Sequence, residues 1–181
     1  MAHHHPPMDL LVEYAAGALP VAQSACVAAH LSYCQRCRQL VDRLEDVGGA
    51  HLERLDPQPV GESVLESVMA RLDDPEPLRY APNEVSDTQL PGLLDRLING
   101  NYADLAWKRV TQSLSISYLK TGDPNHEFAL YRIAEGGRIP EHTHGGSEMT
   151  LVLRGGFADE SGEYHPGDFL VREGWDKHTP V

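Results

Sequence analysis

The spacing of apolar residues changes midway along this 181-residue chain, and that change most constrains what the chain can fold into. Up to residue 72, apolar residues recur at steps of three and four, as in amphipathic helices. From about residue 113 they alternate with polar residues, which is typical of half-buried strands. Between these parts, residues 73–88 read DDPEPLRYAPNEVSDT and are rich in proline and acids. We therefore predict an α+β protein with a helical domain (1–72), a linker (73–88) and a β domain (89–181).

Two helices are expected in the first 52 residues. The first covers Leu10 to Ala16, with Asp9 as its N-cap and Gly17 as its stop. The second begins at Pro20 and is long, and Gly48-Gly49 is expected to interrupt it. Its predicted buried stripe consists of Val27, Leu31, Cys34, Val41 and Leu44.

Further helices are expected on either side of the linker. Ser63 and Glu66 form a Ser-x-x-Glu capping box, which predicts a helix start at about Ser63. A short helix is predicted from Leu90 to Asn99, with Gly100 as its C-terminal cap. The strands predicted after it cover residues 113–118, 128–133, 149–153 and 169–171, with a turn at 121–124.

The first candidate metal site is the pattern His30-x3-Cys34-x2-Cys37. Steps of four and three place these side chains on one face of the predicted second helix. Thiolate and imidazole are ligands that suit Zn²⁺, and a closed structural site needs a fourth ligand from elsewhere. The candidates for that ligand precede the first helix and are His3, His4 and His5.

The cysteines allow two further interpretations. Cys26 lies outside the pattern and is interpreted as a small buried core residue. In the alternative interpretation, Cys34 and Cys37 form a redox switch that oxidises, ejects zinc and releases a partner, which requires accessible thiols.

The second candidate metal site lies in the stretch GGRIPEHTHGGSEMTLVLRG, residues 136–155. His142 and His144 are two apart and point to the same side of a strand, and Glu148 returns on or near the adjoining strand. Two histidines and a carboxylate suit Zn²⁺ or another divalent transition metal such as iron or manganese. This spacing is that of the first cupin motif.

The second cupin motif survives only in its histidine. Counting from Gly167 places His178 at the ligand position, while Glu173 and Trp175 replace the usual Pro and Gly. We predict His178 as the fourth ligand and His165 as the reserve. Since a cupin barrel usually continues beyond this point, the sequence predicts a truncated chain or a last strand from elsewhere. An exposed edge of this kind favours a homo-oligomer.

Residues 5–72 resemble the zinc-binding anti-sigma domain, through the His-x3-Cys-x2-Cys pattern and the stretch Tyr14-Ala15-Ala16-Gly17 followed by a proline. The resemblance implies that His5 is the fourth zinc ligand. Joined to a cupin, a β-barrel of the double-stranded β-helix type, this domain resembles the ChrR family of anti-sigma factors. The resemblance implies that the helical domain binds and inhibits an extracytoplasmic-function sigma factor. It also implies that the cupin is needed to respond to singlet oxygen or organic peroxide.

Charge and hydropathy limit the partners. Fifteen Lys and Arg against 27 Asp and Glu give a net charge of −12, which disfavours direct binding to nucleic acid or an anionic membrane. Neither a signal sequence nor an apolar stretch of about 20 residues is visible, so the expected location is the cytoplasm. We expect a regulator and not an enzyme. The alternative is a cupin metalloenzyme, a dioxygenase or isomerase, with a helical accessory domain.

Overall fold

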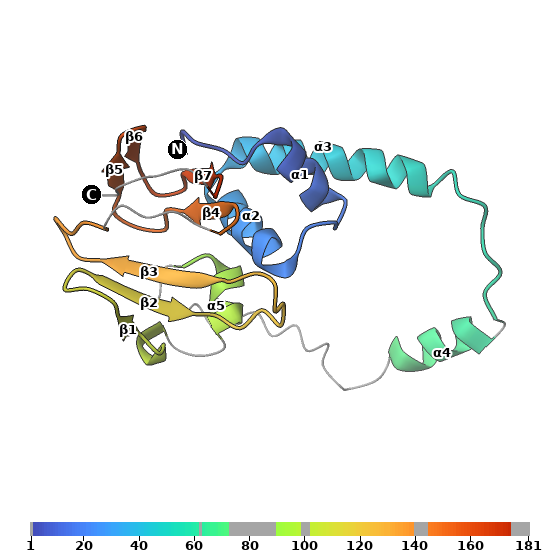
Figure 1. Cartoon of the computed structure of the whole chain (residues 1–181). Helices are drawn as coiled ribbons and strands as arrows, with labels where there is room; N and C mark the ends of the chain where they lie inside the picture. Colours follow the sequence, from blue (N-terminus) through green and yellow to red (C-terminus); the bar gives the residue numbers. More distant parts are fainter. Residues whose placement is uncertain (1, 62, 73–89, 99–101, 140–144, 175–181) are drawn as a thin grey trace.

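The computed structural model describes residues 2–61, 63–72, 90–98, 102–139 and 145–174, which fold into helices followed by antiparallel strands (Figure 1). The helices are α1 (Met8–Ala15), α2 (Val21–Tyr33), α3 (Gln35–Leu52), α4 (Ser63–Leu72) and α5 (Gly92–Ile98). The strands are β1 (Lys108–Arg109), β2 (Leu114–Tyr118), β3 (Ala129–Ile133), β4 (Glu148–Leu151), β5 (Phe157–Asp159), β6 (Gly162–Tyr164) and β7 (Phe169–Arg172). None of the helices in this part of the chain is long and apolar enough to cross a membrane. The predicted combination of helices and antiparallel strands is confirmed.

The start of α1 differs from the prediction. The helix begins at Met8, with Pro7 as its N-cap, so Asp9 lies in the first turn. The Asp9 carboxylate accepts the N–H of Leu10 at 2.9 Å, which still satisfies a free donor at the helix start. Gly17 has φ +67°, the left-handed conformation that ends a helix, and its role as the stop is confirmed.

The predicted long second helix is wrong, because the chain breaks at Cys34 into α2 and α3. Cys34 has φ −115° and ψ 101°, an extended conformation between the two helices. Its sulfur accepts the N–H of Cys37 at 3.4 Å, so the cysteine caps α3 as a serine or aspartate would. Farther along, Gly48 and Gly49 do not interrupt α3, which continues to Leu52.

The helices α4 and α5, before and after residues 73–89, lie close to where the sequence predicts helices. Gly100, the predicted C-terminal cap of α5, lies outside the described residues. α4 begins at Ser63, and every one of its residues is solvent-exposed. In Figure 1, α4 stands apart from the other elements. α5 begins at Gly92, two residues later than predicted, because Leu90 precedes Pro91 and the residue before a proline disfavours the helical conformation.

The strands in the described residues form three antiparallel sheets, β1-β2-β3, β4-β7 and β5-β6. In the first, Leu114 pairs with Ile133, and in the second, Leu151 pairs with Phe169. The four predicted strands correspond to β2, β3, β4 and β7. Sequence periodicity missed β1, β5 and β6, since strands of two or three residues are too short to show alternation.

The main hydrophobic core spans both parts of the molecule. Leu11, Val27 and Val41 from the three N-terminal helices pack in one cluster with Phe169 of β7. Phe169 is only 2% exposed, so the helices cover this strand. α1, α2 and α3 therefore lie against the part of the chain that contains β1 to β7, which we call the β region (Figure 1). The three helices and the β region contribute to one hydrophobic core.

Candidate metal centre

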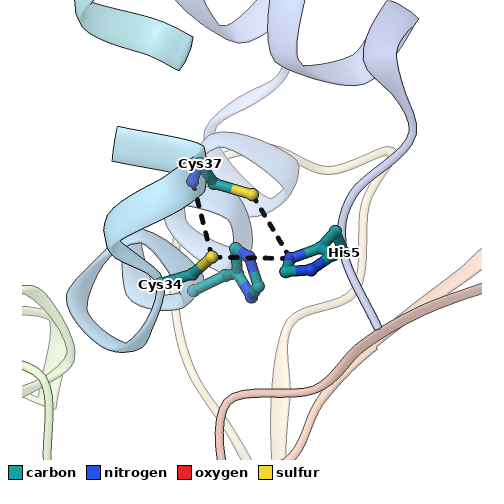
Figure 2. A group of neighbouring side chains, drawn as sticks. His5, Cys34 and Cys37 are labelled. Carbon is teal, nitrogen blue, oxygen red and sulfur yellow. Dashed lines mark hydrogen bonds between the residues drawn. The ribbon is translucent and has the colours of Figure 1, made fainter. Parts of the chain in front are cut away.

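Four side chains from the helical region converge on one buried point. His5 precedes α1, His30 lies in the last turn of α2, Cys34 joins α2 to α3, and Cys37 lies in the first turn of α3. One ligand atom from each lies within 4.8 Å of all the others. Figure 2 shows the His5 ring facing both sulfurs, with Nδ1 at 3.4 Å from Cys34 Sγ and 3.5 Å from Cys37 Sγ.

The break between α2 and α3 builds this group. A continuous helix would hold all three motif residues on one straight face, whereas the extended Cys34 turns the chain between His30 and Cys37. The donors therefore come from three directions: the segment before α1, the end of α2 and the start of α3. Such an arrangement suits tetrahedral coordination better than a single row does.

His30 has one ring nitrogen committed and one free. The residue is fully buried, and Nδ1 lies 2.7 Å from the carbonyl oxygen of Gly167, to which it donates its proton. Nε2 is then a lone-pair acceptor, and it is buried with no hydrogen-bond partner among the described residues. Metal-bound histidines have this pattern, because a hydrogen bond at one nitrogen fixes the ring so that the other can bind the ion.

The electrostatics of the group favour neutral imidazoles. Burial, with a smaller contribution from the Arg36 charge, lowers the pKa of His5. Burial also lowers the pKa of His30, although the hydrogen bond to Gly167 opposes it. Burial raises the pKa of the Cys37 thiol, with further contributions from its hydrogen bond to Cys34 and the Cys34 charge. Both histidines are thus ready to bind a metal ion, while a thiol must release its proton on binding.

The donor set fits a structural zinc ion. It comprises two sulfurs and two nitrogens, the four ligands of a closed tetrahedral site. Three of the four residues, His30, Cys34 and Cys37, are buried and so are shielded from water. Of the three candidate N-terminal histidines, the structure brings His5 to the group. The His4 ring instead lies against the Tyr164 ring, with centroids 4.9 Å apart. The backbone N–H groups of His3 and His4 donate to Asp168.

Cys26 lies outside this group and is buried, as predicted. Burial raises the pKa of its thiol to about 12, so the side chain stays protonated and unreactive at neutral pH.

Most of the second candidate site falls outside the described residues, namely His142, His144 and His178. Glu148 is described: it begins β4, pairs with Arg172 across the sheet and is half-buried. Its charge is among the smaller causes that raise the pKa of Tyr131 to about 12, after burial and Glu127. The second metal site therefore stays a prediction.

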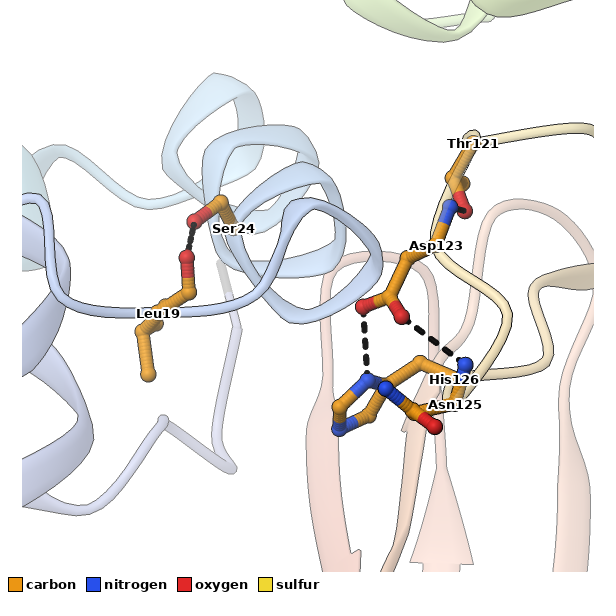
Figure 3. Close-up of polar contacts among 6 residues, drawn as sticks. All are labelled: Leu19, Ser24, Thr121, Asp123, Asn125 and His126. Atoms are coloured by element: carbon orange, nitrogen blue, oxygen red, sulfur yellow. Dashed lines mark hydrogen bonds and ion pairs between the residues drawn. The ribbon is translucent and has the colours of Figure 1, made fainter.

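His165, the reserve ligand, and His126 lie in loops, outside the group of four. His165 is exposed, and its backbone N–H donates to Asp168 at 2.8 Å. The His126 ring lies 2.7 Å from the Asp123 carboxylate, which also accepts the N–H of Asn125 in the same turn (Figure 3).

Sequence reasoning missed the contribution of Gly167 and Asp168 to the first site. The run His-Pro-Gly-Asp at 165–168 is a turn signature, but a turn signature says nothing about which distant segment the turn will contact.

Comparisons with known proteins agree with this architecture. The model of the ChrR cupin-like domain matches residues 96–181. The chain is 37% identical over 178 residues to the anti-sigma-E factor ChrR of Cereibacter sphaeroides, covering 98% of this chain and 83% of that protein. A chain in the crystal structure of Rhodobacter sphaeroides SigE in complex with the anti-sigma ChrR superimposes with a TM-score of 0.84 at 36% identity, covering 100% of this chain and 92% of that one. The chain therefore belongs to the family of ChrR anti-sigma factors, which are regulators and not enzymes.

Proposed function

We propose that this chain is an anti-sigma factor that binds an extracytoplasmic-function sigma factor and thereby represses transcription from its promoters. The observation that carries the proposal is the exposed apolar face of α4. A related chain of known structure is described in complex with SigE, a sigma factor. We assign this role to the helical region, residues 1–72, with 73–88 as the linker to the cupin domain over 89–181.

α4 is amphipathic, yet its apolar side chains contact water. Leu65 and Leu72 are 69% and 68% exposed. At 100° per residue, these side chains share one face with Val64, Val68 and Met69, while Ala70 lies on the opposite face. An exposed apolar stripe of this kind marks a protein-binding surface.

Charge supports a basic protein partner over nucleic acid. The net charge is −12, which repels phosphates and attracts the basic surfaces that sigma factors use on DNA. We therefore propose that the chain acts on the sigma factor without direct contact with nucleic acid. We place this action in the cytoplasm.

We further propose that His5, His30, Cys34 and Cys37 hold Zn²⁺ as a structural ion. A helical region of about 70 residues has a small core and therefore little stability of its own. An ion bound by three of its segments adds free energy of folding. The zinc would then maintain the arrangement of α1, α2 and α3 that the sigma factor contacts.

The test is the affinity of the full chain for the extracytoplasmic-function sigma factor of the same organism, measured by calorimetry. Leu65→Asp on the apolar face of α4 is expected to weaken binding at least tenfold, because interface anchors are typically worth more than about 1 kcal/mol. Ala70→Asp adds the same charge to the opposite face and should leave the affinity within about twofold. Equal affinities for all three chains would exclude α4 as a contact, and no binding by the wild-type chain would overturn the proposed function.

We also propose that the cupin domain is the sensor, responding to singlet oxygen or organic peroxide through a metal held by His142, His144, Glu148 and His178. The ion would be Zn²⁺ or another divalent transition metal. Two observations support the cupin domain as the sensor. The spacing of these residues is that of metal ligands. Cys34 and Cys37 are only 5% and 3% exposed, so the helical region offers an oxidant little access to its thiols.

The sensor proposal is tested on the purified complex with the sigma factor. Exposure to an organic hydroperoxide, or to a singlet-oxygen generator, should release the sigma factor from the wild-type chain and not from His144→Ala. Release from both chains alike would place the sensor elsewhere.

A further inference from the structure

A turn of the β region, His165 to Phe169, contacts the segment that carries His5; we call it the 165–169 turn. One oxygen of the Asp168 carboxylate accepts the N–H groups of His3 and His4, at 2.5 and 3.0 Å. The candidate metal ligand His5 directly follows His4 in the chain. In the opposite direction, the N–H of Phe169 donates to the His4 carbonyl oxygen at 3.1 Å. The N-terminal segment is thus held by two hydrogen bonds to the Asp168 carboxylate and by one from the backbone N–H of Phe169.

The same turn holds the second histidine of the metal centre. The Gly167 carbonyl oxygen accepts the Nδ1 proton of His30 at 2.7 Å, and the Phe169 ring lies edge-on to the His30 ring, with centroids 5.7 Å apart. The contact is close: a Cβ added at Gly167 would lie 2.8 Å from Tyr33 Cβ. Both imidazoles of the centre therefore take their positions from one turn of the β region, whereas both thiols belong to the junction of α2 and α3.

Asp168 is the residue on which this arrangement depends. It is fully buried, and its second carboxylate oxygen accepts the N–H of His165 at 2.8 Å. Burial would raise the pKa of Asp168, but the N–H groups of His4, His165 and His3 together outweigh it and lower the pKa. The side chain is therefore a carboxylate, and it binds the turn and the N-terminal segment at once.

We propose that Asp168 is a positioning residue for the zinc centre, so that zinc binding by the helical region and docking of the cupin-like region strengthen each other. Displacing the turn withdraws the support of His5 and His30, and losing zinc frees the N-terminal segment from the turn. Linkage requires that the two effects be equal in free energy. The inference rests on the proposed zinc ligands and not on the proposed sigma partner.

The experiment compares the zinc affinity of full-length variants by competition with a chromogenic chelator. Asp168→Asn preserves the shape of the side chain but replaces one acceptor oxygen with a donor, so at least one of the three N–H groups loses its partner. We expect zinc to bind about tenfold to 100-fold more weakly, as for other residues that support metal ligands.

Asp159→Asn is the matched control. The Asp159 side chain is also fully buried in the β region, where it accepts hydrogen bonds from Arg172 and Tyr164. It contacts neither the N-terminal segment nor the 165–169 turn by any hydrogen bond among those described. Its zinc affinity should stay within about threefold of wild type, and an equal loss in both variants would assign the effect to general destabilisation.

A double-mutant cycle separates positioning from mere stability. If Asp168 acts through His5, then Asp168→Asn should cost much less zinc affinity in a His5→Ala background than in the wild-type chain. Additive losses would overturn the role in positioning His5, and so would wild-type affinity in Asp168→Asn. Failure of the wild-type chain to bind one zinc per chain would overturn this inference and the proposed zinc site together. Zinc binding without sigma-factor binding would contradict only the proposed function.

Discussion

The two ring nitrogens of His30 differ in their surroundings, and this difference explains how the metal centre is tied to the rest of the molecule. Nδ1 donates to Gly167 in the β region, and Nε2 is left buried for an ion. The preference for an ion follows from the cost of leaving a buried acceptor unpaired, about 1 to 3 kcal/mol. Cys34 likewise has two roles, since its sulfur both caps α3 and faces His5.

The Cys26 thiol is expected to react slowly with alkylating agents. Because burial raises its pKa to about 12, only about one thiol in a thousand is ionised at pH 9. Its alkylation rate in the native chain should therefore rise about tenfold per pH unit up to pH 10 without levelling off. Mass spectrometry of chains treated with iodoacetamide checks this. A plateau near pH 8.5, as for a free cysteine, would show that the thiol is not buried.

Gly167 is required by both its conformation and its neighbour. Its φ is +95°, and a Cβ there would lie 2.8 Å from Tyr33 Cβ, so Gly167→Ala should lower the free energy of unfolding by about 2 to 4 kcal/mol. Gly122→Ala is the control, because Gly122 has φ +79° but nothing within 4 Å of an added Cβ. It should cost only the backbone strain, about 1 kcal/mol. Urea unfolding measures both, and equal losses would mean that the Tyr33 contact is unimportant.

At the scale of elements, β7 connects the helices to the β region. It pairs with β4 along its length, and its first residue, Phe169, is inserted in the cluster formed by α1, α2 and α3. α4 is the opposite case, an amphipathic helix whose apolar face contacts no other described element. The first helices are therefore stabilised within the chain, whereas α4 is available to a partner.

Phe169→Ala should lower the free energy of unfolding by about 3 to 5 kcal/mol, since it removes a buried ring from the shared core. Val171→Ala, in the same strand but 39% exposed, should cost less than about 1 kcal/mol. Chemical denaturation followed by circular dichroism compares the two. A small loss for Phe169→Ala would mean that the helices do not depend on this strand.

At the scale of the whole molecule, the shared core and the 165–169 turn are expected to make the two parts unfold together. Both tryptophans, Trp107 and Trp175, lie in the second half of the sequence, while most helical residues lie in the first. Tryptophan fluorescence and helical circular dichroism therefore monitor different parts of the molecule. In a two-state transition the two signals coincide.

Removing zinc with a chelator should lower the midpoint of both signals together. A ligand at 100 times its Kd stabilises the folded chain by about 2.7 kcal/mol, and that contribution is lost on chelation. Thermal unfolding recorded with both probes, before and after chelation, checks the expectation. A shift in circular dichroism alone would show that the β region is independent of the zinc centre.

Several features of the protein follow from the sequence because they depend on residues close together along the chain. The change of apolar period separates helices from strands, Gly17 ends α1, and Ser63 marks the start of α4. The spacing of His30, Cys34 and Cys37 places three possible ligands within two turns. Local periodicity and capping are set by neighbouring residues, so they can be predicted without knowledge of tertiary contacts.

The tertiary structure alone decided three other features. Helical periodicity did not reveal the break at Cys34. A cysteine is seldom an N-cap, and the spacing of His30, Cys34 and Cys37 also suits a continuous helix. Ligand spacing alone left His3, His4 and His5 open, and only the resemblance favoured His5; its position depends on Asp168, which lies more than 160 residues away along the chain. The hydrogen bond between His30 and Gly167 likewise joins residues that are far apart along the chain. The physical reason is that spacing determines which side chains share a face, whereas the packing of β7 against the helices determines which faces meet.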